Sequence, residues 1–515
     1  MVYAMNADAT LPAYAAIPTK SRNLIISATL LALFLGALDA LVVSAAMPTM
    51  VVDLGGLDLY SWVYSSYLLT RTIALPIFGK LADIYRTKTL YIISIVIFIA
   101  ASLAAGFADS MIFLIICRAI QGIGAGGNFA LVYIVLADIS PPQERGKTLS
   151  LGSFVWGLAS VLGPTMGGFI VAYVSWPWIF FINVPLGMLS LIGVSLYLVE
   201  TRAKKQNATI DLGGAITLTI TVLSLLFIFL LGGQRYSWIS PQILTLWAVT
   251  ISFGIVFFII EQRAKDPILP ISLFKQRGFT AGNASVFMSS FAIFSFFGFA
   301  PLFIQGALGK SPVEVGTTVL ALSLGWSVGS MVLGRLVHIW GSDKSAAAGA
   351  VFLAAGCGLT LTFSTATSTT TCFWVFTLVG IGMGFVALAT ILVVQNSVDP
   401  SDLGVATSSH QFSRNLGGTV GIGICGSIFT AGFSASLHSA FEGNNPGTIP
   451  ESLAAQIRQN AESVLRPEIQ AQLSPDVLLE LNQAIAHGVL MVFGATIAAA
   501  VACLICCLLL PREKS

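Results

Sequence analysis

Two stretches decide the fold of this chain: Arg118-Ala-Ile-Gln121-Gly122-Ile-Gly124-Ala-Gly126-Gly127 and, further on, Ala159-Ser-Val-Leu-Gly163-Pro164-Thr-Met-Gly167-Gly168. Ala159, Gly163 and Gly167 lie four residues apart, which places them on one helix face and lets two helix backbones approach closely in lipid. Pro164 kinks the helix at the same place. The pattern predicts membrane helices that bend and pack closely.

Arg118 is a charged residue inside an apolar run. On membrane-insertion scales such a residue costs about 2.5–3.5 kcal/mol, so it normally faces a partner or a water-filled cavity. Together with the kink and the close packing, this charge predicts a moving pathway for a solute.

The composition is that of a polytopic membrane protein. Of the 515 residues, 56% are hydrophobic and 9% are charged, whereas soluble domains carry about 25% charged residues. The formal net charge of +2 gives no basic face for nucleic acid. The first apolar run, from Leu24, is about 24 residues long, too long for a signal-peptide core, and we interpret it as an uncleaved first span.

The positions of the cysteines argue against a disulfide framework and a metal site, and the absence of known enzyme motifs argues against an enzyme. Six of the seven cysteines lie inside apolar segments and the seventh, Cys372, starts one. No His, Asp or Glu lies between Cys503 and Pro511 to complete a metal site. The sequence contains no G-x-x-x-x-G-K-[ST] loop, metal-spaced histidine pair or G-x-S-x-G elbow. We therefore expect no catalytic residues, metal or cofactor, and energy from an ion gradient.

Apolar windows of about 20 residues predict fourteen spans in an all-α bundle. They cover residues 24–47, 60–80, 89–108, 111–137, 148–173, 177–199, 212–232, 242–262, 280–306, 314–338, 346–364, 372–395, 405–432 and 485–510.

Basic residues are concentrated in the loops on the side of the N-terminus, whereas the opposite loops carry mainly Arg235 and Lys310. The positive-inside rule then predicts an integral protein of the cytoplasmic membrane with both termini in the cytoplasm. The basic residues are Lys20, Arg22, Lys80, Arg86, Lys88, Arg145, Lys147, Arg202, Lys204, Lys205, Arg263, Lys265, Lys275 and Arg277.

One large loop is predicted on the outside, at about residues 433–482. Ser474-Pro475-Asp476 is typical of a helix start, and this helix is expected to lead into the last span. A substrate lid is one interpretation of the loop, and a solvated amphipathic segment is the favoured one.

An internal repeat divides the chain into two halves. Gly79-Lys80-Leu81-Ala82-Asp83 aligns with Gly334-Arg335-Leu336-Val337-His338 at an offset of 255 residues (334 − 79). The glycines from Gly122 align with those from Gly380 at an offset of 258 (380 − 122). These near-constant offsets predict a six-span half in 1–200, two inserted spans in 201–277 and a second six-span half in 278–515. Arg118 falls opposite Phe376, and Pro164 opposite Ile422.

These motifs resemble the major facilitator superfamily and, within it, the fourteen-span drug/proton antiporter family. The segment Gly79 to Lys88 is similar to the cytoplasmic loop motif of the superfamily, in which an acid at the position of Asp83 holds neighbouring helix ends. Arg86 stands where a glycine is usual, and Thr87 where a base is usual. The resemblance implies the major facilitator fold and a gating role for Gly79, Asp83, Arg86 and Lys88.

The segment from Ala159 to Gly168 resembles the antiporter motif of exporters. The resemblance gives Ala159, Gly163, Pro164, Gly167 and Gly168 a part in conformational gating. Three weaker resemblances accompany it: Leu38-Asp39 with Pro48, Trp176 to Pro185, and Gln411 to Gly418.

Asp39 and Arg118 form the predicted proton-coupling pair. At 1.5 Å of rise per residue, Asp39 lies about 22 Å into a span entered from inside and Arg118 about 10 Å into one entered from outside. The two side chains then meet at one level. Asp39 is the proton carrier and Arg118 the switch, because a carboxylate responds to a nearby positive charge. A static ion pair that only fixes the bundle is the alternative.

Arg71, His410 and Arg414 lie nearer the middle of their spans, where such transporters bind substrate. Three basic-capable groups favour an anionic, zwitterionic or neutral amphiphile over an organic cation. The alternative is that carbonyl groups or Asp39 satisfy the arginines. The other predicted substrate-binding residues are Gln121, Gln305, Gln395 and Asn396.

The sequence therefore predicts a proton-coupled antiporter that exports amphiphilic small molecules by alternating access. Its expected partners are the substrate, protons and the lipid bilayer. A proton-coupled uptake transporter and a transport-inactive sensor or scaffold are the alternatives; the motif around Gly163 and Pro164 argues against uptake.

Overall fold

The computed structural model describes residues 18–55, 59–200, 211–233, 236–443 and 475–512. Regular structure in these ranges is helical, apart from one isolated β-bridge between Gly232 and Tyr236. Thirteen of the described helices are long and apolar enough to cross a membrane. A further long helix, α2, is less apolar because it carries charged residues, among them Arg71 and Asp83. With α2, the described segments match the predicted fourteen spans and the predicted all-α fold.

The first half is a bundle of six helical segments, the last of which is broken at Ile182. Its helices are α1 (Thr19–Leu54), α2 (Tyr60–Ile84), α3 (Thr87–Gly106), α4 (Met111–Asp138), α5 (Pro142–Tyr173), α6 (Trp178–Phe181) and α7 (Asn183–Tyr197).

The second half repeats this organisation after the two inserted helices. The inserted pair is α8 (Leu212–Leu231) and α9 (Pro241–Arg263). The second half comprises η3 (Ile271–Lys275), α10 (Arg277–Leu302), the π-helical turn η4 (Phe303–Ala307), α11 (Pro312–Trp340), α12 (Ser342–Leu359), η5 (Thr360–Thr362), α13 (Thr369–Asn396), η6 (Pro400–Asp402), α14 (Leu403–Gly443) and α17 (Pro475–Leu508).

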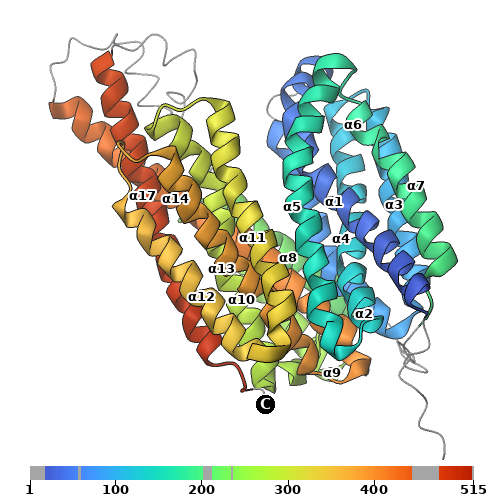
Figure 1. Ribbon diagram of the computed structural model, residues 1–515. Helices are drawn as coiled ribbons and strands as arrows, with labels where there is room; N and C mark the ends of the chain where they lie inside the picture. The colour runs from blue at the N-terminus through green and yellow to red at the C-terminus, as the bar shows by residue number, and fades with distance from the viewer. Residues whose placement is uncertain (1–17, 56–58, 201–210, 234–235, 444–474, 513–515) are drawn as a thin grey trace, which may run out of the picture.

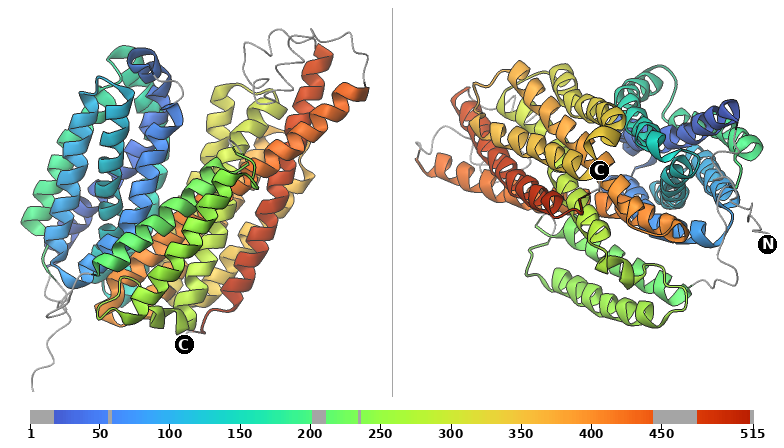
Figure 2. Two further views of the ribbon diagram at one scale, coloured as in Figure 1. Left: turned by 180° about the vertical axis from the view of Figure 1, so that it is seen from behind. Right: turned by 60° about the horizontal axis from the view of Figure 1, so that its bottom comes forward.

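The two halves touch at one end of the molecule and diverge toward the other (Figure 1). Helix α1 begins and helix α17 ends at the end where the halves touch, which we call the terminal end. The view from behind in Figure 2 shows the same divergence, with α8 lying along the seam between the halves and α9 packed against α8.

The glycine ladder of α4 allows the closest helix packing in the first half. A Cβ atom added at Gly122 would lie 2.5 Å from the carbonyl oxygen of Tyr67 in α2, and one added at Gly124 would lie 2.6 Å from the backbone nitrogen of Phe98 in α3. In the second half, Gly380 makes the equivalent close approach to the carbonyl oxygen of Leu322. The repeat found in the sequence is therefore a repeat of packing.

Helix α8 packs into the seam between α2 and α14. Leu69 and Ile73 of α2 form a buried cluster with side chains of α8, and Phe412 of α14 packs against it. At the end opposite the terminal end, the indole Nε1 of Trp238 donates a hydrogen bond to Ser427 Oγ in α14, at 3.1 Å. The inserted pair thus contacts both halves.

The predicted outside loop is shorter than expected, because both neighbouring helices extend into the range 433–482. Helix α14 continues to Gly443, and α17 begins at Pro475. The helix start predicted at Ser474-Pro475-Asp476 is confirmed from Pro475 onward. Residues 444–474, with most of the predicted loop, lie outside the described residues.

Candidate functional site

Asp39 and Arg118 meet inside the first half, as their depths in α1 and α4 predicted. Arg118 Nη1 donates to Asp39 Oδ2 at 2.5 Å, and both side chains are fully buried. The other carboxylate oxygen, Oδ1, accepts from Gln121 Nε2 at 2.8 Å and from Asn183 Nδ2 at 2.9 Å. The Asp39 carboxylate therefore accepts hydrogen bonds from three side chains.

A second layer of bonds holds these partners in place. Arg118 Nη1 also donates to Gln121 Oε1 at 2.7 Å, which orients the amide. Ser102 Oγ accepts from Asn183 Nδ2 at 2.9 Å and donates to the carbonyl oxygen of Phe180 at 3.0 Å. The three donors to the carboxylate and Ser102 are all 0% exposed. The network is therefore sealed from solvent in this structure.

The polar atoms of Arg118 have less complete hydrogen bonding than the carboxylate of Asp39. Its Nε donates to the carbonyl oxygen of Val63 at 3.4 Å, and its guanidinium carbon lies 4.1 Å from the centre of the Tyr67 ring. Its Nη2 is buried and has no hydrogen-bond partner. A guanidinium beside an aromatic face keeps a favourable contact when its carboxylate is lost, so Arg118 can leave Asp39 without becoming isolated.

The sequence placed Gln121 with the substrate, whereas the structure places it on the Asp39 carboxylate. Asn183 was not predicted as a site residue. It is the first residue of α7, directly after the break at Ile182. The motif from Trp176 to Pro185 includes Asn183. A buried amide at a break in a span is unusual, and this feature could have indicated a site residue.

At the terminal end, Asp83 of α2 caps a helix of the other half. Its two carboxylate oxygens accept from the backbone nitrogens of Gly404 and Val405, at 2.8 and 2.9 Å. These nitrogens belong to the first turn of α14, where the helix dipole favours a negative charge. A Cβ at Gly79 would collide with Ser408 of the same helix. Gly79 and Asp83 therefore join the two halves.

Arg86 and Lys88 do not take part in this junction. Arg86 is exposed and stands at the N-cap position of α3. The backbone nitrogen of Lys88 donates to the Glu200 carboxylate at 3.4 Å, within the first half. Of the four residues of the loop motif, the structure brings only Gly79 and Asp83 to the other half.

A second junction joins α5 to α11. A Cβ at Gly146 would lie 2.6 Å from Val337, and one at Gly334 would lie 2.7 Å from Ser150 Oγ. Gly146 corresponds to Gly404 by the repeat offset of 258, so the two junctions are related by the repeat. His338 stands at the position equivalent to Asp83 in the second junction.

The antiporter-type stretch packs against α1 just beyond Asp39. A Cβ at Gly163 would lie 2.7 Å from Leu41 Cβ, and Ala159 is fully buried. Gly167 is buried, but Gly168 is exposed, with nothing within 4 Å of an added Cβ, so it does not belong to the packing face. Pro164 lies within α5, and its side chain is outside the described part.

Arg71 and Arg414 lie on the same ring, that of Phe129 in α4. The guanidinium carbons are 4.4 and 4.9 Å from the ring centre. Neither arginine makes an ion pair within the described residues, and Asp39 is occupied by its own partners. The alternative that Asp39 satisfies these arginines is therefore wrong.

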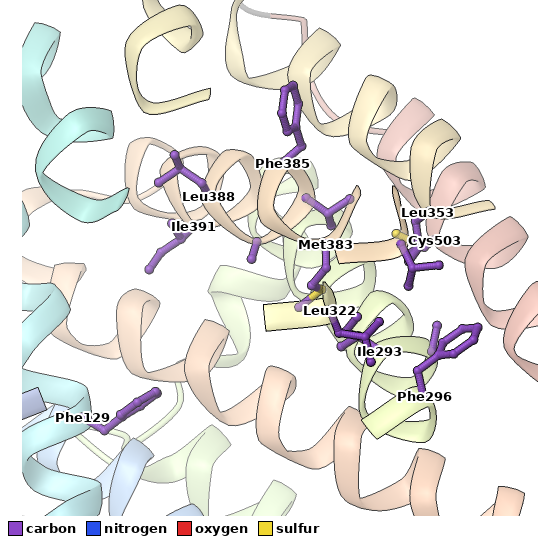
Figure 3. Close-up of a cluster of buried hydrophobic side chains, with 14 of the residues drawn as sticks. Phe129, Ile293, Phe296, Leu322, Leu353, Met383, Phe385, Leu388, Ile391 and Cys503 are labelled. Carbon is purple, nitrogen blue, oxygen red and sulfur yellow. The ribbon is translucent and has the colours of Figure 1, made fainter. Parts of the chain in front are cut away.

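Two tryptophans complete this group. Arg71 lies 5.4 Å from the ring of Trp156 in α5, and Arg414 lies 5.8 Å from the ring of Trp326 in α11. Figure 3 shows the ring of Phe129, which belongs to the first half. It lies apart from the other labelled side chains, all of which come from the second half. We call Arg71, Phe129, Trp156, Trp326 and Arg414 the central group. The sequence predicted its arginines but not its three rings.

The remaining predicted substrate residues are spread along the bundle. His410 is buried, with Nε2 2.9 Å from Thr390 Oγ1, and Gln395 Nε2 donates to Thr407 Oγ1 at 3.1 Å. Gln305 is exposed in the turn η4, at the end of the bundle opposite the terminal end. Asn396 is exposed at the terminal end and accepts from Arg145 Nη1 at 3.3 Å. Gln305 and Asn396 therefore do not share one pocket.

Comparison with known proteins identifies the class of this molecule. The model of the Major Facilitator Superfamily matches residues 29–422, and the chain belongs to this superfamily. It is an integral membrane transporter, as predicted, and the names of its relatives point away from an enzyme.

Two relatives are proteins of Bacillus subtilis. The chain is 35% identical over 481 residues to "Multidrug transporter protein MdtP", covering 93% of this chain and 88% of the relative. It is 32% identical over 473 residues to "Multidrug resistance protein 3", covering 92% of each. The crystal structure of the human organic anion transporter MFSD10 has the same fold, with a TM-score of 0.62 at 13% identity, covering 94% of this chain and all of that one.

Proposed function

We propose that this protein exports amphiphilic small molecules across the cytoplasmic membrane in exchange for protons, by alternating access. The names of the multidrug relatives support the substrate class. The sealed carboxylate of Asp39 carries the proposal of proton coupling.

Asp39 is the acid best suited to carry a proton through the membrane. Three acids of the described residues are buried: Asp39, Asp83 and Glu261. Asp83 and Glu261 lie within two residues of their helix ends, and backbone nitrogens occupy both carboxylates. Asp39 lies far from either end of α1 and is bound only by side chains.

Arg118 controls the charge of Asp39. While Arg118 donates to the carboxylate, the ionised form is favoured, and withdrawal of a positive charge favours protonation. The ring of Tyr67 offers Arg118 a place to remain when the carboxylate takes up a proton. Because Gly163 packs on Leu41, movement of α5 is passed to the helix that carries Asp39.

Both termini are proposed to lie in the cytoplasm, which follows from the basic loops at the terminal end. The contact between the halves at that end then makes this an outward-facing state. The segments 1–200 and 278–515 rock against each other, and the Asp83 cap on α14 breaks when the cytoplasmic side opens. Helix α8 stays on the seam.

Reconstituted liposomes with an imposed pH gradient test the proposal. We expect Asp39→Asn to abolish gradient-driven accumulation of a fluorescent amphiphile while expression stays near wild type. The control is Asp53→Asn, since Asp53 is an exposed acid of the same helix, whose side chain accepts from Trp176 Nε1. Gradient-driven transport by Asp39→Asn at the wild-type rate contradicts the proposal, and transport in the uptake direction favours the alternative function.

A further inference from the structure

We propose that the central group is a binding site for organic anions, with Arg71 and Arg414 holding the anionic oxygens and the three aromatic rings holding a flat apolar part. The ligand class is an aromatic carboxylate or sulfonate. The inference deepens the proposed function and rests on it for the idea that substrate enters between the halves.

The repeat relates the polar members of the central group in pairs. The offset of 255 places Arg71 opposite Trp326 (71 + 255 = 326), and the offset of 258 places Trp156 opposite Arg414 (156 + 258 = 414). Each half therefore supplies one arginine and one tryptophan, with the two residue types exchanged. Phe129 has no such counterpart, because Ala387 stands at the equivalent position.

Within the described residues, the two charges of the central group have no counter-charge. Arg71 is 4% and Arg414 is 7% exposed, and neither forms an ion pair within the described residues. Since both guanidinium carbons lie near one ring centre, they are less than about 10 Å apart, within one Debye length. Two buried cations at this separation repel each other, and an anion between them removes the repulsion.

The unused polar atoms of the two tryptophans and of Arg71 are all donors. Trp156 Nε1, Trp326 Nε1 and Arg71 Nε are buried and have no hydrogen-bond partner. Buried polar groups in folded proteins are almost always paired, so each unpaired donor calls for an explanation. Three N–H groups and two cations select a ligand that offers several acceptor oxygens, which carboxylate and sulfonate groups provide.

The rings define the rest of the ligand. Phe129 and Trp156 meet edge to face with centres 5.8 Å apart, and Trp326 meets Phe294 in the same way at 6.4 Å. An aromatic ligand continues this arrangement at low entropic cost, because both partners are rigid. An anion without a ring can contact the arginines but cannot make the aromatic contacts.

The site is shared between the two halves. Arg71, Phe129 and Trp156 come from the first half, whereas Trp326 and Arg414 come from the second half. A ligand that touches both arginines binds best when the halves hold them near Phe129. Its affinity therefore differs between the two states of the transporter, as coupling requires.

Binding without transport gives the direct test. We would measure affinity by isothermal titration calorimetry on the purified full chain in lipid nanodiscs at neutral pH, with no gradient. The probes are naphthalenesulfonate, its neutral analogue naphthalenesulfonamide, and the cation naphthyltrimethylammonium. We expect the sulfonate to bind about tenfold to hundredfold more tightly than the sulfonamide, the range of a charged hydrogen bond, and the cation to bind weakest.

Variants locate the binding in the central group. Arg71→Gln and Arg414→Gln should each weaken the sulfonate about tenfold or more and leave the sulfonamide nearly unchanged. Trp326→Phe keeps a ring but removes the N–H group, so a smaller loss is expected. Arg414→Lys keeps the charge and should recover part of the affinity, which separates loss of the site from misfolding. The exposed Arg263 gives the control Arg263→Gln, with wild-type affinity.

Equal affinity for the sulfonate and the cation, or equal losses for all probes in Arg414→Gln, would overturn the anion site. The Asp39→Asn variant separates the two proposals, because it should fail in coupled transport yet bind the sulfonate as wild type does. Coupled transport by wild type without selective sulfonate binding leaves the proposed function intact and removes this inference alone.

Discussion

Arg118 and the pair Arg71 and Arg414 are buried arginines in one protein, but their surroundings are opposite. Arg118 has a carboxylate at 2.5 Å inside a sealed network of one half. Arg71 and Arg414 have an aromatic ring and no acid within the described residues, and they lie where the halves meet. Both proposals rest on this difference: the arginine that is paired with a carboxylate is proposed to control proton coupling, and the two arginines without an acid are proposed to bind a ligand.

The largest expected effect is on stability, which should fall much more when Arg118 is replaced than when Arg414 is replaced. Arg118→Leu leaves the Asp39 carboxylate buried without its cation, which should cost about 3–5 kcal/mol of stability. Arg414→Leu leaves no orphaned acid and should cost far less. Thermal unfolding in detergent measures both. The double change Asp39→Asn with Arg118→Leu should recover most of the loss, and an equal cost for both single changes would remove the distinction.

A second prediction concerns the packing that passes motion to Asp39. Gly163→Leu forces α5 away from α1, because even a Cβ would lie 2.7 Å from Leu41. We expect overpacking to cost about 1–3 kcal/mol and turnover in liposomes to stop. The control is Gly168→Leu, since nothing lies within 4 Å of an added Cβ there. Normal turnover by Gly163→Leu would contradict the proposal that movement of α5 is passed to the network around Asp39.

The central group yields a prediction about selectivity. Arg71→Ala should weaken transport of an anionic or zwitterionic substrate by about 1–3 kcal/mol in apparent affinity, the scale of a lost charged hydrogen bond. Transport of lipophilic cations should improve or stay unchanged, because a like charge is removed from their path. Both substrate classes are measured in the same vesicles, next to thermal stability. Equal loss for every substrate together with lowered stability assigns Arg71 a structural role.

The smallest effect is expected at the junction of the halves. Asp83→Asn removes a negative charge from the first turn of α14, where such a charge contributes about 0.3–1 kcal/mol. The equilibrium should shift toward the state that is open at the terminal end. Spin-label distances between α2 and α14 report the shift. The exposed acid Asp109 provides the control Asp109→Asn, and an unchanged distance distribution in Asp83→Asn contradicts a gating role.

Features set by helix geometry could be predicted from the sequence. The meeting of Asp39 and Arg118 followed from a fixed rise per residue, and the matching close contacts of Gly122 and Gly380 followed from a near-constant repeat offset. The partners of Asp39 could not be predicted, because Gln121 and Asn183 reach it through side-chain direction and a break in a span.

Two differences between the prediction and the structure have a common physical cause. Gln305 and Asn396 were grouped by residue type, although the directions of α10 and α13 place them at opposite ends of the bundle. Phe129 was not predicted, because two arginines from different helices converge on its ring. Contacts between distant segments of this kind leave no local pattern in a single sequence.

Substrate-induced proton release tests the coupling by Asp39 most directly. Purified protein in a weakly buffered solution is mixed with substrate, and a pH indicator follows the protons released. We expect release by wild type and by Asp53→Asn, and none by Asp39→Asn, although all three bind the substrate. Release of the same number of protons by Asp39→Asn would contradict the assignment of Asp39 as the proton carrier.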